Sequence, residues 1–181
     1  MVLTEPIEGE GIMADVARTV TAGRLDAGAW GPFGWLPVPD TDPADGSGRL
    51  AFEWADAHVN VISHGPEEPT RSASGSLVCD RMYRHDTHTQ VLLALDGPSV
   101  IAVAPAAVTF AGPGDLESVR AFLLRPLDAL VLHQGTWHWG PFPLGDAPVH
   151  LFNVQGFGYR DDNASVDLSA PGLGGVEVVV R

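Results

Sequence analysis

Short segments in which apolar residues alternate with polar ones recur along most of the chain, a spacing typical of half-buried β-strands. Turns rich in Gly, Pro, Asn and Asp separate them, and Asp96-Gly97 between two apolar runs indicates a hairpin. We predict strands at residues 50–54, 58–62, 77–83, 89–95, 100–103, 130–133, 149–154 and 176–180, besides the stretch 131–143. Many short strands without an internal repeat favour an all-β barrel or sandwich with antiparallel pairing.

Two segments show helical spacing instead. Residues 8–23 carry apolar side chains four residues apart and end at Gly23, which predicts a helix there. Residues 115–123 combine an Asp115 N-cap with apolar positions at helical spacing. We therefore expect one or two short helices within a single domain, residues 1–181, of which residues 1–27 are a candidate helical N-terminal extension.

Composition excludes several functions. The formal charge is −13, and all ten basic residues are arginine, so a Schiff-base lysine and a lysine general base are excluded. So few cations argue against nucleic-acid binding. No apolar run approaches the roughly 18 residues of a membrane span. The single Cys79 cannot form an internal disulfide, and the N-terminus lacks the features of a signal peptide, so we expect a cytoplasmic protein.

The stretch 131–143, VLHQGTWHWGPFP, is the densest concentration of reactive side chains. In a regular strand, His133 and His138 would lie on opposite faces. A β-bulge at Gly135 would reset the alternation and turn both imidazoles into one cavity. The alternative is that both histidines are core residues bonded to backbone carbonyls, and that Trp137 and Trp139 serve packing.

A second candidate set lies in RMYRHDTHTQ and comprises Arg84, His85, His88 and Gln90. An arginine beside histidines supplies a carboxylate clamp together with a proton carrier. The alternative is a surface ion pair between Arg84 and Asp86, with solvated histidines. Three imidazoles from His85, His88, His133 and His138 could also form an open metal site, although neither an HxH nor an HExxH pattern is present.

Four segments resemble the ureidoglycolate lyase family, a branch of the cupin-like barrels: RHDTHTQVLLALDG, DLESVRAFLLRP, VLHQGTWHWGPFPL and DDNASVDL. The resemblance implies a cupin-like (RmlC-like) antiparallel β-barrel, also called a double-stranded β-helix, that forms a homodimer. It further implies a lyase that cleaves the carbon–nitrogen bond of ureidoglycolate, giving glyoxylate and urea, in allantoin and purine degradation.

The family pattern assigns roles to individual residues. Arg84, His85, Gln90, His133 and His138 match it, whereas Asn153 stands where the family tends to have an acidic residue. Elimination needs a base and an acid, and we hypothesise His138 as the base and His133 or His85 as the acid. For the substrate, we expect Arg84 to hold the carboxylate and Gln90 the ureido group, with Trp137 and Asn153 completing the site.

Two alternatives remain open at this point. One is a metal-dependent cupin enzyme of another class, such as a dioxygenase or an isomerase. The other is a cupin that binds small acids without catalysis. The sequence leaves the cofactor undecided between none and a divalent metal, and the expected partner is a small carboxylate or ureido molecule.

Overall fold

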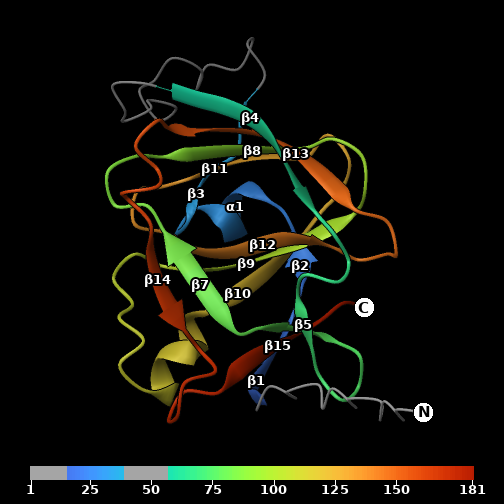
Figure 1. Cartoon of the computed structure of the whole chain (residues 1–181), viewed down its shortest axis with the longest axis vertical. Coiled ribbons are helices and arrows are strands. Elements are labelled where there is room, and N and C mark those ends of the chain that lie inside the picture. Colours follow the sequence, from blue (N-terminus) through green and yellow to red (C-terminus); the bar gives the residue numbers. More distant parts are fainter. Residues whose placement is uncertain (1–15, 39–56) are drawn as a thin grey trace, which may run out of the picture.

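The computed structural model describes residues 16–38 and 57–181. The strand expected at residues 50–54 lies outside them. Three sheets make up the described part (Figure 1). The five-stranded sheet has the order β3 (Gly34–Trp35), β11 (Ala129–Leu132), β8 (Gln90–Ala94), β13 (Val149–Gly156) and β4 (Ala57–His64). The six-stranded sheet has the order β14 (Ala164–Asp167), β7 (Arg81–Arg84), β12 (Trp137–Pro143), β9 (Ser99–Ala104), β10 (Arg120–Leu124) and β2 (Gly23–Arg24). The four-stranded sheet has the order β1 (Val16–Thr21), β15 (Gly175–Val179), β6 (Leu77–Cys79) and β5 (Thr70–Arg71).

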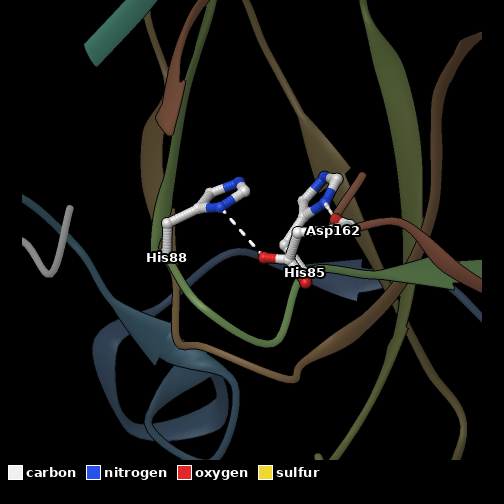
Figure 2. A group of neighbouring side chains, drawn as sticks. All are labelled: His85, His88 and Asp162. Atoms are coloured by element: carbon white, nitrogen blue, oxygen red, sulfur yellow. Dashed lines mark hydrogen bonds and ion pairs between the residues drawn. The ribbon is translucent and has the colours of Figure 1, made fainter. Parts of the chain in front are cut away.

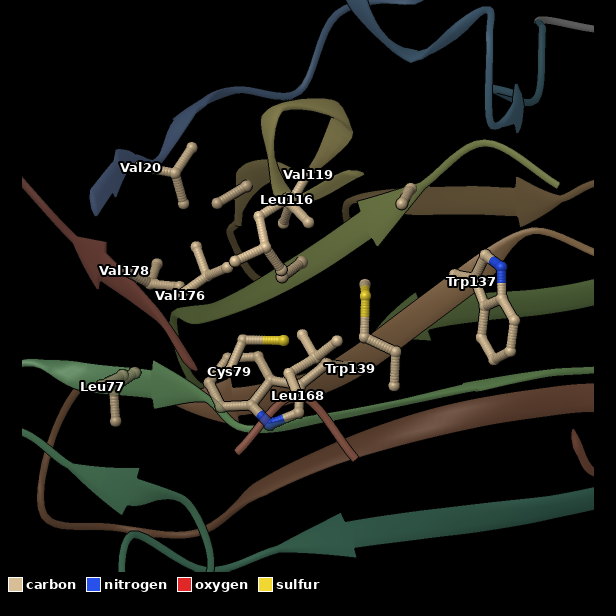
Figure 3. Close-up of a cluster of buried hydrophobic side chains, with 14 of the residues drawn as sticks. Val20, Leu77, Cys79, Leu116, Val119, Trp137, Trp139, Leu168, Val176 and Val178 are labelled. Carbon is tan, nitrogen blue, oxygen red and sulfur yellow. The ribbon is translucent and has the colours of Figure 1, made fainter. Parts of the chain in front are cut away.

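The six-stranded sheet is the middle layer, and its two faces pack against different cores. All six residues of β9, SVIAVA, are buried. Ile101 and Val103 pack with Leu92, Leu130 and Leu151 of the five-stranded sheet, which forms the barrel interior. Apolar side chains on the other face, including Val100, Ala102, Trp137 and Trp139, belong to a second core that also contains Val176 and Val178 of the four-stranded sheet (Figure 3). A strand covered on both faces reads as a continuous apolar run, as β9 does.

Most strand pairs are antiparallel, as expected, but two are parallel. β1 runs parallel to β15, and β2 runs parallel to β10. Both exceptions involve the N-terminal strands, which add to the outer edges of two sheets. In β4, burial alternates along the strand with His58, Asn60 and Ile62 on the more buried face, which confirms the predicted periodicity.

The helix expected at residues 8–23 is wrong for its described part, because Val16–Thr21 forms β1. A spacing of four residues fits both one turn of a helix and every second inward position of a strand. The pattern therefore did not distinguish a helix from a strand. Residues 8–15 lie outside the described part. An unpredicted short helix, α1 (Ala27–Trp30), follows instead, and Asp26 caps it by accepting the N–H groups of Gly28 and Ala29.

The helix expected at 115–123 is present only as far as Ser118 and is wrong beyond it. A short 3₁₀ helix, η1 (Pro113–Ser118), ends before Val119, and β10 begins at Arg120. Ala121 and Phe122 are both buried because β10 belongs to the middle sheet, and such a run mimics a helical face. Within the described residues, no helix is long and apolar enough to cross a membrane.

The turn between β10 and β11 offers a test of backbone strain. Leu127 has a φ of 73° and is 75% exposed, in a turn closed by the Asp128 N–H donating to the Arg125 carbonyl at 2.9 Å. A positive φ suits glycine rather than leucine. Leu127→Gly should raise the free energy of unfolding in urea by about 0.5–1 kcal/mol. Leu127→Ala removes the same side chain but keeps the strain, so an equal gain there would contradict this explanation.

Candidate functional site

A pocket of about 280 Å³ opens at the polar end of the barrel interior, between the five-stranded and six-stranded sheets. Its walls comprise Ile62, His64, Tyr83, His85, Gln90, Leu92, His138, Trp139, Gly140, Pro141, Phe142, Leu151, Gln155, Tyr159 and Asn163. Its volume lies near the lower end of the range for small-molecule sites, which suits a small acid. Four of these residues, His85, Gln90, His138 and Gln155, are buried polar side chains.

Strand alternation decides which side chains of β7 and β12 reach this pocket. Tyr83 pairs with His138, so both face inward, whereas Arg84 and Trp137 face the opposite side of the sheet. There the Arg84 guanidinium lies 4.6 Å from the Trp137 ring centre and 3.1 Å from an Asp86 carboxylate oxygen. Neither residue lines the pocket, which corrects their expected substrate-binding roles, and the ion pair between Arg84 and Asp86 is present.

His133 and His138 do not share a cavity, so the expected joint site is wrong. β11 ends at Leu132, and His133 is exposed on the outer side, with its ring 5.1 Å from that of Trp35. Gly135 does not make a bulge within a strand; it occupies the turn before β12 with a φ of 72°. Its N–H donates to the His85 carbonyl at 2.6 Å, so this turn supports the loop that carries His85.

The structure brings together His85, His88 and His138, which we call the imidazole cluster. The ring centres of His85 and His88 lie 4.6 Å apart, and those of His85 and His138 lie 5.4 Å apart. Because a carbonyl oxygen can only accept, two Nδ1 atoms must carry protons. His85 Nδ1 donates to the Asp162 carbonyl at 2.5 Å, and His138 Nδ1 donates to the Thr136 carbonyl at 3.1 Å. Their Nε2 atoms therefore hold lone pairs in the neutral form.

His88 completes the cluster from the loop before β8. Its Nδ1 lies 3.1 Å from a carboxylate oxygen of Asp162, and its buried Nε2 has no hydrogen-bond partner (Figure 2). Gly156 permits this position, because a Cβ at residue 156 would lie 2.8 Å from the His88 ring. The histidines of this loop are thus buried rather than solvated, at 8% exposure for His85 and 3% for His88.

Burial controls the charge of the cluster. It lowers the pKa of His138 to about 4, and a positive charge on His85 lowers that pKa further. Burial and His85 also lower the pKa of His88, against the opposing effect of Asp162. For the Asp162 carboxyl, burial alone would raise the pKa, but hydrogen bonds from Thr87 and the Asp86 backbone bring it below its usual value. At neutral pH, His138 is neutral and Asp162 is ionised.

A chain of three amides fixes the polar wall opposite the cluster. Gln90 Nε2 donates to Asn153 Oδ1 at 2.8 Å, and Asn153 Nδ2 donates to Asn60 Oδ1 at 2.8 Å. Asn153 is fully buried and does not line the pocket, so it orients Gln90 instead of contacting a ligand directly. Gln90 Oε1 is buried without a hydrogen-bond partner.

The cluster also suits a divalent metal ion. Within the described residues, ligand atoms of His85, His88 and Asp162 lie within 4.8 Å of one another. The Nε2 atom of His88 is buried without a hydrogen-bond partner, and its lone pair could bind an ion. An imidazole whose other nitrogen is held by a hydrogen bond is the usual metal ligand. Two imidazoles and one carboxylate match the donor set of an open catalytic site.

Sequence reasoning missed several participants. Asp162 lies in the quoted segment DDNASVDL, but its spacing carries no recognisable signal of a site. Asn60 lies on the more buried face of β4, and nothing in the sequence indicated a role for it. Tyr83 could have been found, because it lies two positions before His85 and so shares its face.

A sequence model of the family described as ureidoglycolate lyase matches residues 44–171. The chain belongs to the ureidoglycolate lyase family. Its sheets form the all-β, cupin-like barrel that the resemblance implies. Among curated proteins, none matches the sequence.

Two of the solved structures that are similar to this chain are enzymes. A variant of the Bacillus subtilis oxalate decarboxylase is 14% identical over 62% of this chain and 24% of that one, with a TM-score of 0.37. A dTDP sugar isomerase from Desulfovibrio desulfuricans is 12% identical over 76% of each chain, with a TM-score of 0.45. The chain therefore spans about a quarter of the decarboxylase's length.

The low pKa of His138 predicts a pH-dependent stability. Between pH 6.5 and about 4 the unfolded chain binds a proton at His138 that the folded chain excludes, so stability falls as the pH falls. In chelator-treated protein, His138→Gln should flatten the dependence of the unfolding free energy on pH in this window, by up to about 1.4 kcal/mol per pH unit. His133→Gln, which removes an exposed histidine, serves as the control. Equal slopes in the two variants would contradict the shifted pKa.

Proposed function

We propose that the chain cleaves ureidoglycolate to glyoxylate and urea by general acid–base elimination at the imidazole cluster. The observation that carries the proposal is that His85 and His138 line one small pocket, with the His88 ring stacked on that of His85, in a member of the ureidoglycolate lyase family. Two imidazoles held in different protonation states are the usual requirement for moving protons in both directions near neutral pH.

His138 is the base in this proposal. Its Nδ1 proton is held by the Thr136 carbonyl, so the Nε2 lone pair is available to take the hydroxyl proton of the substrate. The carbon–oxygen bond then becomes a double bond as the carbon–nitrogen bond breaks, and the electron pair leaves on the urea nitrogen. His85, in its protonated form, returns a proton to that nitrogen. A substrate carboxylate in the pocket would raise the pKa of His138 and so strengthen the base.

Gln90 supports recognition of the ureido group. Its Nε2 is engaged by Asn153, so the unpaired Oε1 is the atom that a ligand can satisfy. A carbonyl oxygen accepts hydrogen bonds, which suits the N–H groups of a urea. Because a buried acceptor without a partner is costly, a ligand lacking an N–H group at this point should bind less tightly.

The substrate carboxylate cannot be bound by Arg84 as expected, because Arg84 does not line the pocket. No arginine is found among the described residues that line the pocket. Tyr83, Gln155 and Asn163 line it and carry hydrogen-bond donors, so we assign the carboxylate to them.

Substituting the two histidines of the 131–143 stretch separately tests the assignment. His138→Ala should lower kcat/KM for ureidoglycolate by roughly 10²- to 10⁴-fold, the usual contribution of a general base. His133→Ala should leave it unchanged, because His133 lies outside the pocket. Released glyoxylate and urea are measured together. Full activity in a folded His138→Ala variant would overturn the role of His138.

A second candidate is a metal-dependent reaction at the same cluster, favoured by the grouping of His85, His88 and Asp162. A divalent ion bound by these residues would polarise a carbonyl or carboxylate oxygen as a Lewis acid. In that case the chain's own residues would orient the substrate, with Gln90 still accepting from its N–H group.

Exhaustive chelation distinguishes the two candidates. Acid–base elimination predicts that release of glyoxylate and urea survives chelation with kcat/KM within about twofold, because the proton carriers remain. Loss of turnover on chelation and recovery on adding a single divalent ion would assign the imidazoles as ligands. A chelated sample of the His138→Ala variant controls for effects of the chelator on the assay.

A further inference from the structure

The carboxylate of Asp162 lies under the loop that carries His85 and His88, in the turn that follows β13 (Figure 2). Its Oδ1 accepts the Asp86 N–H at 2.8 Å. Its Oδ2 accepts the Thr87 N–H at 2.8 Å and the Thr87 hydroxyl at 2.5 Å. The same Oδ2 lies 3.1 Å from His88 Nδ1. The side chain thus joins two segments more than seventy residues apart in sequence.

Three of these four contacts fall on Oδ2 and one on Oδ1, so the lone pairs of Oδ2 are fully used. A metal ion bound through Oδ2 would have to displace the Thr87 or His88 donors. The carboxylate therefore serves the loop and the imidazole more readily than an ion. Its ionised state is favoured by the same hydrogen bonds, which lower its pKa.

Asp162 also acts through its backbone. Its carbonyl accepts the His85 Nδ1 proton at 2.5 Å, while its side chain faces His88 Nδ1. One residue therefore holds the Nδ1 atoms of two imidazoles. A proton kept on Nδ1 leaves Nε2 as the lone-pair atom, and His138 reaches the same state through the Thr136 carbonyl.

We propose that Asp162 is the positioning residue of the imidazole cluster, which fixes His88 with its proton on Nδ1 and holds the loop so that the Nε2 atoms of His85 and His88 keep their lone pairs. The proposal rests on the proposed function, because the lone pairs would serve a reacting small acid or a divalent ion at that same site. Without the carboxylate, no interaction favours the Nδ1-protonated tautomer of His88 over the other. The backbone N–H groups of Asp86 and Thr87 then form hydrogen bonds with water instead.

The test uses the chain labelled with ¹⁵N-histidine. Nitrogen chemical shifts in NMR spectra report which ring nitrogen of a neutral imidazole carries the proton, and His88→Gln assigns the His88 signals. We expect the wild type to show His88 protonated on Nδ1. In Asp162→Ala, His88 should populate both tautomers. Asp161→Asn removes an exposed carboxylate one position away and should leave the wild-type signals unchanged.

A second variant covers failure of Asp162→Ala to fold. Asp162→Asn keeps the shape but places an amide NH₂ against donors, so it should lose at least one loop contact and shift the His88 tautomers in part. Turnover of ureidoglycolate should fall about 10- to 100-fold in either variant, as for other residues that orient ligating or reacting imidazoles.

The outcomes are separable. His88 that keeps its proton on Nδ1 in a folded Asp162→Ala variant, or in folded Asp162→Asn if the alanine variant does not fold, would overturn the positioning role. A wild type that never cleaves ureidoglycolate would overturn the proposed function, whereas the tautomer of His88 would still confirm or refute the role of Asp162.

Discussion

Burial of the six-stranded sheet on both faces is the constraint on which the rest of the structure depends. Because side chains alternate along a strand, each residue of β7, β9 and β12 belongs either to the barrel interior or to the core under the four-stranded sheet. A shift of one residue in β12 would exchange His138 with Trp137. The register against β9 and β7 therefore fixes which side chain reaches the pocket.

The pocket end of the barrel buries polar side chains, including His85, Gln90 and His138. Buried polar groups are costly unless they are bonded, and most groups here are bonded through carbonyls, amides or the Asp162 carboxylate. Gln90 Oε1 and His88 Nε2 are buried at this end without partners, and both can accept from a ligand. Unsatisfied acceptors among polar groups that are mostly bonded indicate a binding site.

Several features followed from local pattern. The alternation that predicts a strand at residues 58–62 is present in β4. Asp96-Gly97 lies in a turn after β8, but the hairpin expected there is wrong, because β8 pairs with β11 and β13 whereas β9 pairs with β10 and β12. Helix was wrongly predicted for residues 16–21 and 120–123 because their apolar positions have a spacing that also fits a strand in a sheet. Asp162 could not be recognised from local sequence, because its partners lie in a loop far away in the chain that only folding brings close.

The sequence by itself determined the family, the all-β barrel, and His85, Gln90 and His138 as candidates, because motif identity and strand periodicity are local properties. Only the tertiary structure decided that Arg84, Trp137 and His133 lie outside the pocket, and that His88 and Asp162 belong with His85. Those outcomes depend on register and on which faces neighbouring sheets cover. Both are set by packing between segments far apart in the chain, which no local spacing encodes.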